Sequence, residues 1–242
     1  MRISVMADGE VQLAGGLFNH EARSRMVTQA AIAELVLRVA RVGQANISED
    51  DHALIARIAE YVEQRERKFI SDMESVTSSV AEAAAMHDLT HNDARAQMLA
   101  HANAPEMLSF LARTRVISTQ RALRVSLSEP ALLELTERVR AGYPVALAFL
   151  RHLVLDALRG DINWERSDRA NSVWDLSIAF HASRAATING IPVLLVSDDN
   201  RLHDAAASVG HSSFIARLGE YQNLLTPDGV KARERLMLEV AA

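Results

Sequence analysis

Six residues decide the fold that we expect from this sequence: Ile191-Pro-Val-Leu-Leu-Val196. A short, continuous apolar run rich in β-branched residues is typical of a strand buried on both faces of a parallel sheet. Asn189-Gly190 comes directly before this run and predicts the end of a preceding helix. Helix, turn and buried strand form half of an α/β crossover unit, so the sequence predicts an α/β fold with a mainly parallel sheet.

Two acidic side chains follow the predicted strand directly. Asp198 and Asp199 precede a predicted helix over 202–208, which Gly210 closes. In open α/β sheets, ligands bind in the crevice beyond the carboxyl ends of the strands. Both carboxylates therefore lie where a ligand site is expected.

The middle of the chain, 48–160, has an almost wholly helical pattern. Helix start signals stand at Ser48, Thr90 and Ser128, and Gly160 closes the segment, so we expect about five helices. No linker rich in Gly, Ser or Pro separates it from its flanks. We interpret 48–160 as a helical insertion packed on the same domain, whose α/β core comprises 1–47 and 161–242.

Composition narrows the class of protein. The 242 residues are 49% hydrophobic and 24% charged, which is an ordinary globular profile. A net charge of −5 gives no global positive field for a polyanion, and the absence of cysteine excludes disulfides and thiol nucleophiles. No apolar run reaches the ~20 residues of a membrane helix. Acidic residues near the start replace the apolar part of a signal peptide, so we expect a soluble, unprocessed, cytoplasmic protein without membrane partners.

Three segments resemble signatures of the PIN-domain nuclease family. In Asp175-Leu-Ser-Ile-Ala-Phe-His-Ala182, an Asp opens a helix with Ile-Ala and a later Ala. In Val196-Ser-Asp-Asp-Asn-Arg-Leu202, a strand ends in Ser-x-Asp with an apolar residue three further on. Thr28-Gln-Ala-Ala-Ile-Ala-Glu-Leu35 is similar to a third motif, in which a Ser or Thr precedes a helical Glu-Leu by six residues. The resemblance implies a three-layer α/β/α PIN-like fold with a central, mainly parallel sheet, here enlarged by a large α-helical insertion.

The resemblance also implies a site. PIN domains hold Mg²⁺ or Mn²⁺ with acids from separate elements and hydrolyse phosphodiester bonds, many of them in single-stranded RNA as toxins or in RNA processing. Glu34, Asp175 and Asp199 become the catalytic and metal-site candidates, with Asp8 as a fourth metal ligand. Carboxylates are the ligands that hard cations choose, and a bound cation activates water and neutralises phosphoryl charge.

Four further residues that lie near these acids in the sequence are secondary candidates: Ser197, Asp198, Asn171 and Asp168. Arg201 and Arg38 are the candidates for contact with the substrate, because they stand next to the acidic motifs and carry positive charge.

Each acid also has a structural interpretation. Asp8-Gly9 is a strong hairpin signal, so Asp8 is either a ligand or a turn residue. Asp175 can favour the positive end of its helix, and Glu34 can be a solvated surface group. Asp168 and Asn171 can point into the same cleft or cap the helix. Asp198 and Asp199 are both suited to cap the following helix. We assign the metal to Asp199, and we assign to Asp198 either the cap or a contact that supports the metal ligands.

The expected function is a Mg²⁺- or Mn²⁺-dependent endoribonuclease that acts on single-stranded RNA, as a toxin or an RNA-processing enzyme. One alternative is a non-catalytic PIN-like scaffold that binds a protein partner, and another is a nuclease acting on DNA. A protein inhibitor or antitoxin and a homodimer remain open as partners.

Overall fold

The structure is a computed structural model that describes 49–160, 162–164, 171–180, 187–188, 191–192 and 194–224. Helices make up 80% of this part of the chain. Its first stretch contains the five helices α3 (Glu49–Met86), α4 (His91–Asn103), α5 (Glu106–Leu123), α6 (Glu129–Gly142) and α7 (Pro144–Arg159). The remaining elements are α9 (Ser172–Ala179), β1 (Thr187–Ile188), β2 (Ile191–Pro192), β3 (Leu195–Val196), α10 (Asn200–Ser208), η1 (Ser212–Phe214), β4 (Ile215–Ala216) and α11 (Leu218–Leu224).

Local signals in the sequence set the ends of these helices as expected. Thr90 is the N-cap of α4, and its hydroxyl accepts a hydrogen bond from the backbone N–H of Asp93 at 3.2 Å. Gly160 ends α7 with φ of +79°, a left-handed conformation that favours glycine. The prediction of about five helices over 48–160 is therefore confirmed.

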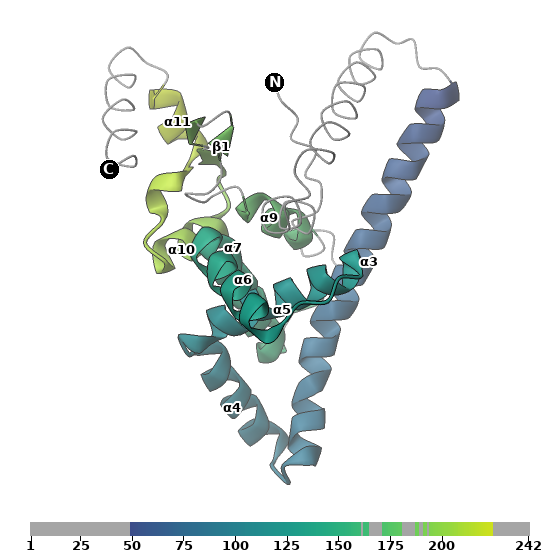
Figure 1. Cartoon of the computed structure of the whole chain (residues 1–242), viewed down its shortest axis with the longest axis vertical. Coiled ribbons are helices and arrows are strands. Elements are labelled where there is room, and N and C mark those ends of the chain that lie inside the picture. Colours follow the sequence, from purple (N-terminus) through teal and green to yellow (C-terminus); the bar gives the residue numbers. More distant parts are fainter. Residues whose placement is uncertain are drawn as a thin grey trace.

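Helix α7 forms the centre of the hydrophobic core. The five consecutive side chains of 145–149 are each at most 1% exposed, so the first turns of this helix are covered on all sides. Helix α7 is surrounded by α3, α4, α5, α9 and α10, which all pack on it (Figure 1). An amphipathic helix buries only one face, whereas a helix that is apolar on all sides must be surrounded by other elements to keep its side chains from water.

A sharp corner separates α7 from the helix before it. Pro144 occupies the first turn of α7, where its missing N–H removes no helical hydrogen bond, and the axes of α6 and α7 meet at 91°. Within the part of the chain that the structure describes, no single helix is long and apolar enough to span a membrane. Helices α6 and α7 meet that criterion only as this bent pair.

Helix α3 extends beyond the core. Its 38 residues correspond to about 57 Å at 1.5 Å per residue. Phe69, Met73 and Val80 in its second half are buried, whereas Ile55 and Ile58 in its first half are more than 40% exposed. Figure 1 shows this first half projecting away from the other labelled helices.

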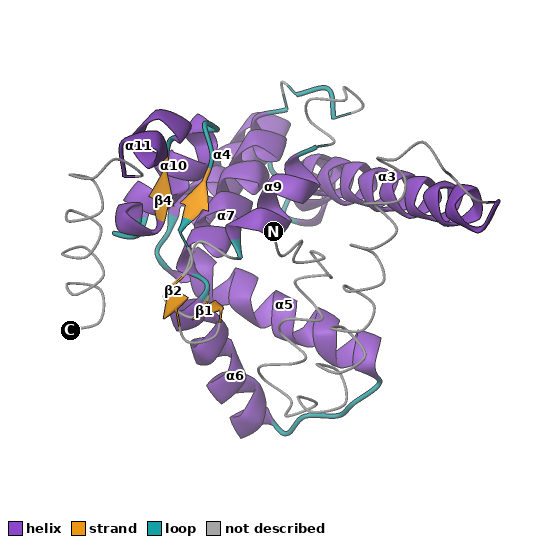
Figure 2. Ribbon diagram, turned by 90° about the horizontal axis from the view of Figure 1, so that it is seen from above, coloured by secondary structure: helices purple, strands orange, loops and turns teal. Residues whose placement is uncertain are grey.

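The predicted three-layer α/β/α fold with a central sheet is wrong. Among the described residues, the strands form two separate pairs of two residues each, β1 with β2 antiparallel and β3 with β4 parallel (Figure 2). The run from Ile191 to Val196, which we interpreted as one strand, is divided between β2 and β3 of different pairs. An apolar run indicates burial without specifying the partner, and here helices around α7 bury most of the apolar surface.

Candidate functional site

The site begins where the parallel strand pair ends. Leu195 and Val196 of β3 lie opposite Ile215 and Ala216 of β4, and the N–H of Ser197 donates to the carbonyl of Ala216 at 2.9 Å. This last bond holds the chain beside β4 just beyond the carboxyl end of β3. The acidic pair 198–199 therefore follows the strand directly, as the sequence predicts.

Asp199 then starts helix α10. It has an extended backbone at the N-cap, and its Oδ1 accepts a hydrogen bond from the backbone N–H of Arg201 at 2.8 Å. The hydroxyl of Ser197 accepts from the N–H of Asp199 at 3.2 Å, and Nε2 of His203 lies 2.7 Å from the carbonyl oxygen of Ser197. These bonds fix the strand-to-helix turn, and Oδ2 of Asp199 contacts a guanidinium that also contacts a second acidic residue.

That second acid is Asp175, in the first turn of α9. The guanidinium of Arg201 joins the two acids, because its Nη2 lies 3.4 Å from Oδ2 of Asp175 and 3.2 Å from Oδ2 of Asp199. Nη1 donates to the hydroxyl of Ser172 at 3.1 Å, and the guanidinium carbon lies 5.7 Å from the ring centre of Phe149. Three helices, α7, α9 and α10, thus meet at one arginine.

The surroundings of this cluster raise the pKa of one of its two acids, Asp175. The side chains of Asp175, Asp199 and Arg201 are 26%, 25% and 29% exposed, so solvent screens them only in part. Burial raises the pKa of Asp175 above its ordinary value, the charge of Asp199 raises it further, and Arg201 lowers it. One guanidinium balances one of two carboxylates, which leaves the cluster with a formal charge of −1 when both acids are ionised.

Asp198 contributes to a neighbouring contact instead. Its Oδ1 accepts from the backbone N–H of Leu218 at 3.1 Å, at the start of α11. Arg217 donates to the carbonyl of Asp198 at 3.5 Å and to Oδ1 of Asn200 at 2.7 Å. The helix cap, which was one of the two roles that we expected for Asp198, is made by Asp199, and Asp198 connects the turn to α11.

The other sequence candidates divide into two groups. Asn171 immediately precedes α9, but its side chain makes no capping hydrogen bond. Asp8, Glu34, Arg38 and Asp168 lie outside the described residues. Among the residues that are described, no group of three or more His, Asp or Glu side chains is arranged to hold a metal ion.

Sequence reasoning missed the partners of Arg201. We expected this residue to contact the substrate, whereas here it bonds both acids and the hydroxyl of Ser172, which is fully buried. The position of Arg201 two residues after a capping Asp is a weak signal for its pairing with Asp199. Nothing in the sequence signals the contacts with Ser172 or Phe149, because both depend on how the helices pack.

No family model matches this chain, and neither a curated protein nor a solved structure matches it. The interpretation of the site therefore depends on the chemistry of its own residues.

Proposed function

We propose that this chain is a Mg²⁺- or Mn²⁺-dependent endoribonuclease in which Asp175 and Asp199 hold the cation. The observation that supports it most is the meeting of these carboxylates, from α9 and α10, at one guanidinium. Acids delivered by separate elements to one point are the basic requirement of a hydrolytic metal site. The raised pKa of Asp175 is the expected result of placing two carboxylates close together in partial burial.

The donor atoms suit a hard cation. Carboxylate oxygens and the Ser172 hydroxyl are oxygen ligands, which Mg²⁺ and Mn²⁺ prefer. Arg201 contacts the Oδ2 atoms of both acids, so a cation would compete with its guanidinium for them. Two acids are fewer than a complete site needs, and we propose Glu34 and Asp8 as the further ligands on the basis of the sequence.

A cation bound there would supply an activated water and would neutralise charge on the phosphoryl oxygens. The residues of the chain position the carboxylates that bind the cation and supply a positive charge for the phosphate. Asp175 and Asp199 fix the ligand position through the starts of two helices, because Asp199 is also the N-cap of α10. Arg201, once displaced from the carboxylates, is a cation beside them that can donate two parallel hydrogen bonds to a phosphate.

The experiment is a cleavage assay on single-stranded and double-stranded RNA and DNA, with Mg²⁺, with Mn²⁺ and with EDTA. We expect cleavage of single-stranded RNA that EDTA abolishes. Asp175→Asn and Asp199→Asn should each lower the rate about a hundredfold or more, since both keep size and remove one charge. Asp198→Asn is the matched control, because the amide oxygen can still accept from Leu218, and it should keep most activity.

A second candidate function is a non-catalytic scaffold that binds a protein partner. The observation that favours it is the pairing of Arg201 with both acids, because such a guanidinium can equally serve to hold α9 and α10 together. The assay separates the three cases. Cleavage of DNA alone indicates a DNA nuclease, and no cleavage of any substrate with either metal indicates the scaffold. Cleavage that is unchanged in Asp199→Asn contradicts the assignment of the site.

A further inference from the structure

We propose that Arg201 makes the binding of a divalent cation and the binding of a phosphodiester cooperative, because its guanidinium moves from the carboxylates to the phosphate. This inference rests on the proposed function, since it concerns the regulation of that same site. It adds that the site binds the cation weakly until a phosphate is present. The support comes from four contacts of the guanidinium, two of them with charged groups and two with neutral groups.

The two charged contacts place Arg201 where a cation would bind. Its Nη2 lies 3.4 Å from Oδ2 of Asp175 and 3.2 Å from Oδ2 of Asp199, so both oxygens already face a positive charge. The other oxygen of Asp199 accepts from the backbone N–H of Arg201 in the helix cap. A divalent cation therefore binds strongly only when Nη2 leaves the carboxylates, because positive charges a few ångströms apart repel each other in a partly buried site.

The two neutral contacts keep Arg201 beside the acids after that movement. Nη1 donates to the hydroxyl of Ser172 at 3.1 Å, and the guanidinium carbon lies 5.7 Å from the ring centre of Phe149. Ser172 and Phe149 are fully buried, so the core fixes both partners. Neither contact depends on the charge of the carboxylates. The guanidinium can therefore release the acids by turning about these contacts, without leaving the site.

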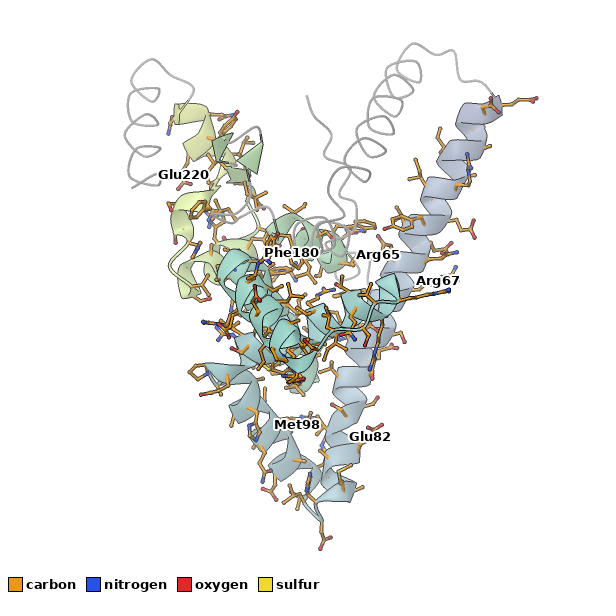
Figure 3. All side chains as sticks on the ribbon, viewed as in Figure 1. Arg65, Arg67, Glu82, Met98, Phe180 and Glu220 are labelled. Atoms are coloured by element: carbon orange, nitrogen blue, oxygen red, sulfur yellow. The ribbon has the colours of Figure 1, made fainter. Side chains whose placement is uncertain are left out.

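Helix α9, which carries Asp175, is anchored at both ends. At its start, Nε1 of Trp174 donates to the carboxylate of Glu66 on α3 at 2.8 Å. At its end, Phe180 is 4% exposed, and Figure 3 shows it close to the centre of the molecule. The side chain of Arg201 is long and 29% exposed. The arginine is therefore the part of the cluster that can move, while the acids stay in place.

A phosphodiester supplies the anion that the released guanidinium needs. The planar guanidinium donates two parallel hydrogen bonds to a phosphate, and a phosphate on the cation brings its negative charge to this place. With both acids ionised, the formal charge of the cluster is −1 alone, +1 with a divalent cation and 0 with a cation and a phosphodiester together. Each ligand thus removes the charge that opposes the other. By linkage, each must raise the affinity for the other by the same factor.

The test measures the affinity of the full chain for Mn²⁺ with and without dimethyl phosphate, a stable phosphodiester monoanion, at constant ionic strength. Free Mn²⁺ is measured by its electron paramagnetic resonance signal. Saturating dimethyl phosphate should lower the Kd of Mn²⁺ about tenfold or more, within the range of roughly 5–150-fold that is typical of coupled sites. Saturating Mn²⁺ should lower the Kd of dimethyl phosphate by the same factor.

Substitution of Arg201 separates the two effects. Without dimethyl phosphate, Arg201→Met should bind Mn²⁺ about tenfold more tightly than the wild type, because no guanidinium opposes the cation. Its coupling factor should fall about fivefold or more, to the part that direct contact between cation and phosphate supplies. Ser172→Ala removes one neutral contact and should reduce the coupling factor less. Arg217→Met is the matched control and should keep the wild-type values, because Arg217 bonds Asn200 and the carbonyl of Asp198 outside the pair.

The guanidinium can also be followed in the unaltered chain. With ¹⁵N-labelled arginine and Mg²⁺ as the cation, the Nε–H signal of Arg201 should move when Mg²⁺ and dimethyl phosphate are added together. This change should exceed the sum of the changes that the two ligands cause separately. The signal of Arg217 is the internal control and should not show this excess. The measurement keeps the proposal testable even if Arg201→Met does not fold.

The outcomes distinguish this proposal from the proposed function. Equal coupling factors in the wild type and Arg201→Met overturn the cooperative role of Arg201, and so does Mn²⁺ binding that the substitution leaves no tighter. An Arg201 signal that responds to the two ligands only additively overturns it as well. In a chain that binds Mn²⁺ and cleaves RNA, these results leave the proposed function in place. Absence of Mn²⁺ binding in both chains, with and without dimethyl phosphate, overturns both proposals.

Discussion

Arg201→Met is the substitution that most directly tests how the acidic pair is balanced. Methionine keeps an unbranched apolar stem and removes the guanidinium. It therefore deletes the contacts with Asp175 and Asp199, the hydrogen bond to Ser172 and the contact with the Phe149 ring. Two carboxylates then face each other without this cation.

The expected cost can be worked from these contacts. Partly exposed ion pairs contribute about 0–1 kcal/mol each, a hydrogen bond from a charged donor about 1.5–3 kcal/mol, and a cation–π contact about 0.5–1 kcal/mol. Because these terms are not additive, we expect a loss of about 2 kcal/mol in the free energy of unfolding at pH 7. For a chain of this size that loss lowers the melting temperature by about 4–8 °C.

The pH dependence has a definite sign. The pKa of Asp175 is raised in the folded state, so the folded protein binds the proton more tightly than the unfolded chain. Ionised Asp175 therefore costs stability above its folded pKa, and this cost disappears as the pH falls toward the ordinary value of 3.8. Without Arg201 the pKa of Asp175 rises further. The deficit of Arg201→Met should therefore be largest near pH 7 and should shrink between pH 7 and pH 4.

Thermal melts over this pH range, with and without Mg²⁺, are the assay. If Arg201 competes with a cation, Mg²⁺ should stabilise Arg201→Met more than the wild type. Arg217→Met is the control, because Arg217 bonds Asn200 and the carbonyl of Asp198 outside the pair. A variant that melts within 1 °C of the wild type at pH 7, with the same pH dependence, refutes the reasoning about charge balance.

Three further substitutions test the frame of the site. Phe149→Ala empties a fully buried position in α7 and should cost about 3–5 kcal/mol, measured by urea unfolding. Thr90→Ala removes the hydroxyl that accepts from the N–H of Asp93 and should cost about 1 kcal/mol, with faster amide exchange confined to the first turn of α4. Trp174→Phe removes the indole N–H that donates to Glu66 at 2.8 Å and should cost about 1–2 kcal/mol, while unchanged stability would show that this bond does not tether α9 to α3.

Local structure was predictable because its causes are local. Thr90 caps a helix through a residue three positions away, and Gly160 ends one through its own backbone conformation. The helix after Asp198-Asp199 begins at Asn200, two residues before the predicted start, and Gly210 follows its end with φ of +72°. These features depend on neighbours within one turn, which the sequence displays directly.

The prediction of the fold failed because the fold depends on contacts between segments that lie far apart in the sequence. The apolar run 191–196 indicates burial, but the element that covers such a run is decided by chain segments far away. Helix α7 occupies the centre of the core, and its first turns are apolar on every side. The resemblance directed the interpretation toward a sheet, but the core is formed mainly by helices, α9 and α10 among them.

The site was predictable in part for the same reason. The meeting of Asp175 and Asp199 at one guanidinium agrees with their assignment to a common cluster, although their hold on a metal stays a prediction. The cap that we considered for Asp198 is made by Asp199, because both residues are aspartates and only packing against α11 distinguishes them. Arg201 was placed near the acids, but its bond to Ser172 depends on the approach of α9.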